Sequence, residues 1–171
     1  MSVRATIICL GMHRSFTSLT AKGMTLSGVH MGRTLLGACH GNQYGHWEDK
    51  AFIAMNDRIL RVAGGAWNDP PSAEKIAVAG QVLAEDIERL VRASEVAPLW
   101  GWKDPRTTLT VECYLHHVKN PVLVPNFRRP DDVADSLRRR DGMPIECGKK
   151  LAAEYNRRLL RTLGKFTELI R

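Results

Sequence analysis

The sequence contains no long hydrophobic run: nowhere do its 171 residues approach the roughly 20 consecutive apolar residues that a membrane-spanning helix needs. The first apolar run, Ala5–Leu10, is interrupted by Gly11 and a basic turn, which is not the pattern of a secretory signal peptide. Internal repeats, low-complexity tracts and linkers are also missing. We therefore expect a soluble cytoplasmic protein with a single domain over residues 1–171, large enough to bury a core.

Cysteine is scarce, and its positions show neither a CxxC pair nor a spacing typical of metal ligands. The four cysteines are Cys9, Cys39, Cys113 and Cys147. Cys9 falls within the first apolar run, which indicates a buried thiol. We therefore expect reduced cysteines rather than disulfides, and no bound metal ion.

Acidic residues are outnumbered, with 18 Asp and Glu against 25 Lys and Arg, which gives a formal net charge of +7. The arginines are concentrated at 128–140 and 157–161. This excess favours a partner rich in phosphate or sulfate. The chain has no zinc-finger spacing, RNP-like aromatic pattern or Gly-Arg repeat, which argues against sequence-specific binding of nucleic acid.

Short apolar runs alternate with helical patterns along the chain. Strands are predicted at Ala5–Leu10, Leu99–Lys103 and Pro121–Phe127, and Pro125 favours an edge position or a bulge for the last. Helices are predicted at 17–28, 47–64, 72–94, 107–117, 130–142 and 144–163, and a final strand at 166–171. The alternation predicts an α/β fold, a three-layer sandwich with a mainly parallel sheet.

A strand, a tight turn and a helix N-terminus meet near the start of the chain. The strand ends at Gly11, a basic turn runs from Met12 to Ser18, and the helix begins near Thr17. Unpaired backbone N–H groups and the helix dipole make such a turn a site for an anion. The side chains that add a charge and three hydroxyls are Arg14, Ser15, Thr17 and Ser18. We predict that this turn holds a phosphate-like group.

The turn matches only part of the P-loop pattern GxxxxGK[ST]. Gly11 and Ser18 match, whereas Phe16 replaces the second glycine and Thr17 replaces the lysine. In nucleotide hydrolases and kinases that lysine neutralises the β- and γ-phosphates beside Mg²⁺. The sequence therefore disfavours an ordinary ATP or GTP site, and a P-loop kinase acting on a nucleoside or small molecule is kept as an alternative.

Four segments resemble the sulfotransferases that use 3′-phosphoadenosine-5′-phosphosulfate (PAPS). The family's turn reads roughly (Lys/Arg)-Ser-Gly-(Thr/Ser)-(Thr/Ser), and residues 14–18, RSFTS, match all but the glycine. Its second motif, an FRHP-type strand end with a serine eight residues after the arginine, is similar to FRRPDDVADSL, which supplies Arg128 and Ser136. GNQYGHWED and WGWKDPRTTLT resemble segments of the bacterial and phage branch.

The resemblance implies a P-loop nucleoside triphosphate hydrolase-like fold and transfer of a sulfuryl group from PAPS to a hydroxyl or amine. The product would be 3′,5′-adenosine bisphosphate (PAP), no metal is required, and the acceptor would be a small molecule or carbohydrate. The donor-binding residues that it implies are Arg14, Ser15, Phe16, Thr17, Ser18, Arg128 and Ser136. Family members generally continue beyond the last strand, so part of the acceptor side is expected to be absent. A non-catalytic member that binds nucleotide or polyanion is a second alternative.

Sulfuryl transfer needs a cation at the bridging oxygen and a general base for the acceptor. The resemblance assigns the cation to Arg14. Glu48, at the predicted start of a helix, is the first candidate for the base, and His46 is the second because it titrates near neutral pH. Lys103 ends a predicted strand and is expected to line the same cleft, where it assists the sulfuryl oxygens or forms a structural ion pair.

Phe16 is the main departure from the family pattern. The glycine of the family allows a close backbone approach and a positive φ, which phenylalanine resists. We therefore expect either an ordinary backbone conformation at Phe16 or impaired affinity for the donor.

Overall fold

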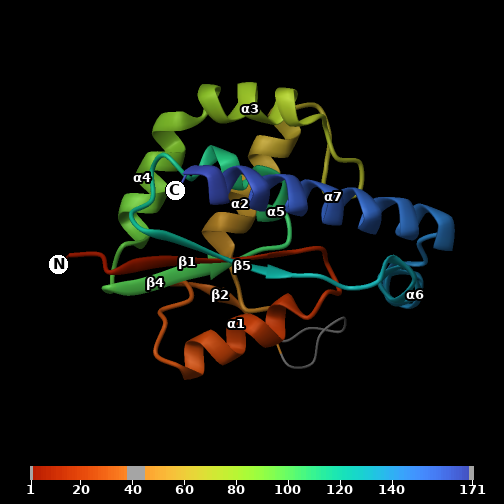
Figure 1. The fold of residues 1–171 in the computed structure, drawn as a ribbon, viewed down its shortest axis with the longest axis horizontal. Coiled ribbons are helices and arrows are strands. Elements are labelled where there is room, and N and C mark those ends of the chain that lie inside the picture. The colour runs from red at the N-terminus through yellow and green to blue at the C-terminus, as the bar shows by residue number, and fades with distance from the viewer. Residues whose placement is uncertain (1, 38–44, 170–171) are drawn as a thin grey trace.

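A computed structural model of the chain describes residues 2–37 and 45–169. Its centre is a parallel sheet in the order β4–β1–β5 (Figure 1), made of β1 (Ala5–Gly11), β4 (Leu99–Lys103) and β5 (Pro121–Asn126). The helices are α1 (Thr17–Leu26), α2 (Lys50–Val62), α3 (Ala73–Val82), α4 (Ala84–Ser94), α5 (Thr107–Thr110), α6 (Pro130–Asp141) and α7 (Ile145–Leu169), and η1 (Val111–Cys113) is a 3₁₀ turn.

The strand register brings the three carboxyl ends to one edge of the sheet. Cys9 of β1 lies opposite Lys103 of β4, and Gly11 lies opposite Asn126 of β5. β5 is an edge strand, so Pro125 costs the sheet no interior hydrogen bond, as the sequence predicted. The residues that follow each strand therefore project toward a common region.

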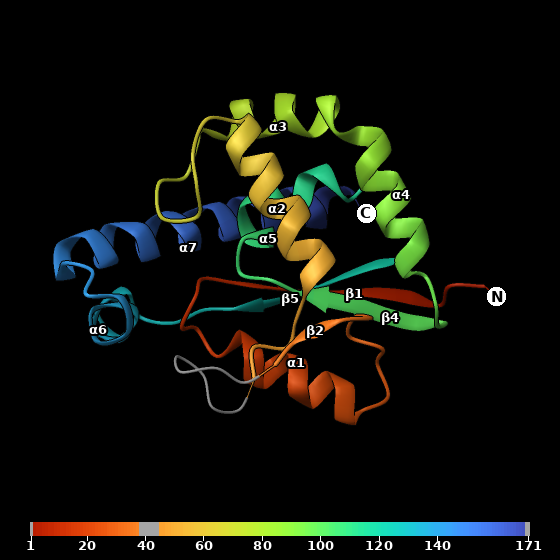
Figure 2. The same cartoon turned by 180° about the vertical axis from the view of Figure 1, so that it is seen from behind.

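Both faces of the sheet are covered by helices. Ile7 and Cys9 pack with Ala21 of α1 on one face, whereas Ile8 and Leu10 join the larger core on the other. Figures 1 and 2 show α1 alone on its side, with α2, α3, α5 and α7 on the opposite side. A central parallel strand must be apolar on both faces, which is why its sequence reads as an unbroken apolar run. The predicted α/β fold with a mainly parallel sheet is confirmed.

Several sequence predictions of secondary structure differ from the structure. The strand predicted at 166–171 is wrong, because α7 continues to Leu169 and residues 170–171 lie outside the described residues. The predicted helix 72–94 is divided at Leu83, where φ is −103° and ψ is 10°. The helix predicted at 107–117 ends after one turn and continues as η1, in keeping with the low helix propensity of its threonines.

A short antiparallel pair was not predicted from the sequence. β2 (Leu35–Leu36) pairs with β3 (Glu48–Asp49), so Glu48 lies in a strand and not at a helix start. The N-cap of α2 is Asp49, whose side chain accepts a hydrogen bond from the Ala51 N–H. This pair fixes the backbone on which Glu48 sits.

None of the helices within the described residues is long and apolar enough to cross a membrane. Cys9 is buried in β1 as predicted, and burial raises the pKa of its thiol to about 12, although the charge of Lys103 opposes this. Cys113 and Cys147 are also free thiols, and Cys39 lies outside the described residues.

Candidate anion-binding site

A cavity of about 480 Å³ lies at the carboxyl edge of the sheet, beside the turn that joins β1 to α1. Ligands of open α/β sheets bind at this edge, and the volume is in the usual range for a small-molecule site. The predicted site residues that line the cavity are Arg14, Phe16, Thr17, Ser18, His46, Glu48, Lys103 and Arg128. The structure thus gathers residues from separate sequence motifs around one space. Residues 41–44 of the GNQYGHWED segment lie outside the described residues.

Gly11 allows the turn to form directly at the end of β1. Its φ is +145°, and a Cβ there would lie 2.7 Å from the carbonyl oxygen of Asn126, so a larger residue has no room. Its N–H donates to Thr108 Oγ1 at 2.7 Å, and the Ser15 N–H donates to the Met12 carbonyl at 3.2 Å. The first N–H groups of a helix have no partner within it, so the start of α1 favours an anion.

Arg14, Arg128 and Ser136 form one cluster beside the turn. The Nε of Arg14 donates to Ser136 Oγ at 2.7 Å, and Arg128 donates from its guanidinium to the Arg14 carbonyl, also at 2.7 Å. Ser136 belongs to α6, is buried and is not among the residues that line the cavity, whereas its partner Arg14 is. Two arginines that follow different strands are therefore held within one hydrogen-bonded unit.

Phe16 adopts the left-handed conformation, with φ 63° and ψ 11°, at the N-cap of α1. Of the two expectations for this position, an ordinary backbone conformation is excluded by this φ. The other, impaired affinity for the donor, stays a prediction, and weaker binding of the donor product by Phe16→Gly would contradict it. Phe16 as a residue is 58% exposed, and the guanidinium of Arg128 lies over its ring, 4.6 Å from the centroid. The side chain therefore takes part in the cluster.

Lys103 is the centre of a buried ion-pair network that lines the same cavity. Its Nζ lies 2.6 Å from Glu48 Oε1, and it also donates to Ser18 Oγ and to the His46 carbonyl, both at 3.2 Å. The side chains of Lys103 and Glu48 are only 2% and 6% exposed. Ser18 Oγ donates to the His46 carbonyl at 3.0 Å. These bonds attach the start of α1 to β3 and β4.

The network holds Glu48 in its charged form. Burial raises the pKa of this carboxyl, but the nearby His46 and the charge and hydrogen bond of Lys103 outweigh burial and lower the pKa to about 2. A carboxylate with so low a pKa is a weak proton acceptor at neutral pH. The geometry therefore favours an ion-pair role for Glu48 over the predicted general base. His46, whose Nδ1 lies 3.8 Å from Glu48 Oε1, keeps its place as a candidate.

The same carboxyl predicts a dependence of stability on pH. Its pKa is lowered from 4.5 in a free side chain to about 2, so its contribution is complete above about pH 4.5 and is lost as the pH falls toward about 2. We expect the free energy of unfolding of Glu48→Gln to change less steeply across this window than that of the wild type. Denaturant titrations from about pH 5 to about pH 2 test this, and parallel curves would contradict it.

Ser15 departs from its predicted role. The residue is 1% exposed, and its Oγ has no hydrogen-bond partner among the described residues. It does not line the cavity. Ser15 therefore contributes its backbone N–H to the turn, and its hydroxyl is not presented to a ligand.

The structure adds His13, Lys22 and Arg140 to the cavity wall, which sequence reasoning did not assign. Lys22 lies four residues after Ser18 on α1, so helical spacing alone indicated a shared face. Arg140 belongs to the arginine-rich stretch but is indistinguishable there from its neighbours. His13 is buried against Trp67, with ring centroids 4.5 Å apart, and burial followed by the charge of Arg106 lowers its pKa well below the usual range.

Positive charge dominates the cavity. Burial, together with the charges of Arg140 and Arg128, lowers the pKa of Arg14. Such crowding of cations opposes folding unless an anion offsets it. The electrostatics therefore agree with the backbone geometry: this end of the sheet suits a ligand with more than one negative group.

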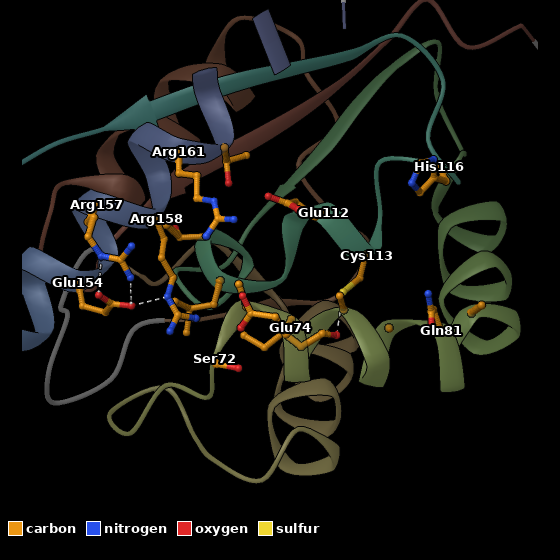
Figure 3. Close-up of a pocket in the computed structure, with 18 of the residues that line it drawn as sticks. Ser72, Glu74, Gln81, Glu112, Cys113, His116, Glu154, Arg157, Arg158 and Arg161 are labelled. Carbon is orange, nitrogen blue, oxygen red and sulfur yellow. Dashed lines mark hydrogen bonds and ion pairs between the residues drawn. The ribbon is translucent and has the colours of Figure 1, made fainter. Parts of the chain in front are cut away.

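A larger cavity of about 560 Å³ lies elsewhere, between α3, η1 and α7 (Figure 3). Three of its charged side chains pair with one another: Glu154 lies 2.8 Å from Arg157 and 2.6 Å from Arg158. None of the predicted site residues among the described positions lines it. We place the candidate site at the strand-end cavity because an anion-binding backbone and a lining with more Arg and Lys than carboxylates coincide there.

Comparisons of the chain with protein-family models, with curated proteins and with solved structures found no match.

Proposed function

We propose that this chain is a sulfotransferase of P-loop nucleoside triphosphate hydrolase-like fold, which moves a sulfuryl group from PAPS to a hydroxyl or amine of a small molecule or carbohydrate. The observation that carries the proposal is that Arg14 and Arg128 are joined by a hydrogen bond beside the N-terminus of one helix, α1. Arg14 follows β1, Arg128 follows β5, and Arg128 donates to the Arg14 carbonyl at 2.7 Å. Two joined cations suit a donor that carries one anionic group at the 5′ position and another at the 3′ position.

Each group in the site has a role in this proposal. The 5′-phosphosulfate lies at the start of α1, where Arg14 and the first N–H groups of the helix bind its oxygens. Arg128 binds the 3′-phosphate, and Ser136 orients Arg14 from behind. Lys103, held by Glu48, places an ammonium beside Ser18 and assists the sulfuryl oxygens. A P-loop has a lysine where this chain has Thr17. In this arrangement Lys103, at the end of β4, supplies that positive charge instead.

The transfer is an in-line displacement at sulfur. The acceptor oxygen or nitrogen forms a bond to sulfur while the bond from sulfur to the bridging phosphate oxygen breaks, and PAP leaves with that electron pair. Arg14 stabilises the charge that grows on the leaving group, as in phosphoryl transfer. The acceptor proton passes to a general base, for which His46 is the better candidate given the ion pair of Glu48.

Calorimetric titration tests the proposal. PAP is expected to bind without metal and more tightly than ATP with Mg²⁺, because the site offers two cations and no P-loop lysine. The control is Arg161→Gln, which removes an arginine from the other cavity and should leave the affinity unchanged. Absence of PAP binding would overturn the proposal, and preference for ATP with Mg²⁺ would favour a kinase. PAP binding without turnover on a broad acceptor panel would indicate the non-catalytic alternative.

A further inference from the structure

Phe16 is a strained residue whose side chain gains little from burial. Its φ of 63° lies in the left-handed region, which is costly for a bulky residue and costs glycine nothing. The residue is 58% exposed, so removal of apolar surface from water offsets little of that cost. Strain that persists without burial indicates a specific role for the side chain.

The Phe16 ring contacts Arg128. The guanidinium lies 4.6 Å from the ring centroid, within the range of a cation–π interaction. In this pose Arg128 also reaches the Arg14 carbonyl at 2.7 Å. The face of the guanidinium is thus occupied by the ring, whereas its edge is the part that binds phosphate oxygens in a bidentate manner.

Arg128 has an acidic partner in the same pose, besides the Phe16 ring and the Arg14 carbonyl. Asp132, one helical turn along α6, has its Oδ2 3.9 Å from Arg128 Nε, and this aspartate side chain is 50% exposed. Ion pairs of this length with an exposed carboxylate are weak, so the stacked ring adds substantially to the anchoring of the guanidinium. Without the ring, the long Arg128 side chain would regain rotamer freedom.

We infer that Phe16 is a positioning residue for Arg128, which it holds over the anion-binding turn so that the site selects ligands with a second anionic group. The inference rests on the proposed function for the identity of the ligand. It explains why phenylalanine occupies a backbone position suited to glycine: the ring supplies a platform that glycine lacks. Phe16 acts through Arg128 and takes no part in the chemistry.

The experiment compares two ligands that differ in one phosphate. In Phe16→Gly and Phe16→Leu we expect binding of PAP to weaken about threefold to tenfold, in line with the loss of one cation–π contact. Binding of adenosine 5′-phosphate, which lacks the 3′-phosphate, should stay unchanged. Phe16→Tyr keeps the ring face and should keep the affinity for PAP. The matched control is Leu19→Ala, because Leu19 is an exposed apolar residue that lines the same cavity and carries no aromatic ring to stack on Arg128.

A double variant separates positioning from a general effect on the turn. In the Arg128→Gln background, Phe16→Gly should cause no further loss of PAP affinity, because the residue that it positions is already gone. Equal losses for PAP and adenosine 5′-phosphate, or an unchanged affinity for PAP in Phe16→Gly, would overturn the inference. Thermal unfolding checks the fold of Phe16→Gly, which should be at least as stable as the wild type because glycine relieves the strain.

A measurement on the free protein keeps this test apart from that of the proposed function. The Nε–H signal of Arg128 in ¹⁵N NMR should report an ordered, ring-shifted guanidinium in the wild type and a mobile one in Phe16→Leu. An Arg128 signal that does not respond to loss of the ring would overturn the inference, whatever the ligand. Failure of the wild type to bind PAP would instead overturn the sulfotransferase proposal.

Discussion

Replacement of Lys103 by methionine is expected to lower the free energy of unfolding by about 3–5 kcal/mol, the usual effect of removing one partner from a buried ion pair. The Lys103 side chain is 2% exposed, and its Nζ lies 2.6 Å from Glu48 Oε1. Without it, the buried Glu48 carboxylate keeps only more distant cations, of which Arg106 lies at 4.0 Å. The variant also loses the hydrogen bonds to Ser18 Oγ and the His46 carbonyl.

A double-variant cycle identifies the source of this loss. Lys103→Met combined with Glu48→Gln should cost less than the sum of the two single changes, because the second change removes the charge that the first leaves unpaired. Lys22→Met is the matched control, since Lys22 lines the same cavity without a buried carboxylate partner among the described residues. Denaturant unfolding measures all four proteins. A loss below about 1 kcal/mol in Lys103→Met would place this pair among weak surface salt bridges.

The sheet was predictable because its signals are local. The run from Ala5 to Leu10 is apolar at every position, as a strand covered on both faces must be, and Pro125 excluded a central place for β5. The end of α7 was not predictable in this way. The segment 166–171 is short enough to suit a strand or the end of a helix, and a short apolar pattern does not distinguish the two.

The candidate site was predictable only in part. The anion-binding turn is a local feature, and the residues from Arg14 to Ser18 carry its signal. The contacts that shape the cavity join distant positions: Lys103 and Glu48 are 55 residues apart, and Arg14 and Ser136 are 122 apart. No local pattern specifies such pairs. The ion pair of Glu48 was not predictable for this reason, since a sequence shows a carboxylate near a helix but not the lysine that lowers its pKa.

The buried histidine of the turn shows the same limit. His13 lies between Met12 and Arg14, in a stretch whose sequence signal for an anion site comes from its hydroxyls and its arginine. Its imidazole is 8% exposed and packs on Trp67, which the loop before α3 brings back to the turn. Only the tertiary structure shows that this group, held neutral by burial and by neighbouring cations, belongs to the cavity wall.

Replacement of Arg14 by glutamine is expected to weaken the binding of PAP about 100-fold, which corresponds to about 2.7 kcal/mol. Charge-assisted hydrogen bonds to phosphate are about twice as strong as neutral ones, and Arg14 is held beside the start of α1 by its bond to Ser136 Oγ. Arg14→Lys keeps the charge but loses the planar fork, so its affinity for PAP should fall between those of the wild type and Arg14→Gln. Titration calorimetry with PAP measures each variant, with Arg161→Gln as the control.

The stability of Arg14→Gln separates a ligand-binding role from a structural one. Burial and the charges of Arg140 and Arg128 lower the pKa of Arg14, which means that the folded protein holds this cation at a cost. Removal of the charge should therefore leave the free energy of unfolding unchanged or raise it, while the affinity for PAP falls. A variant that unfolds more readily and still binds PAP within about threefold of the wild type would assign Arg14 to the fold instead. Weaker binding with undiminished stability is the combination expected of a residue retained for its ligand.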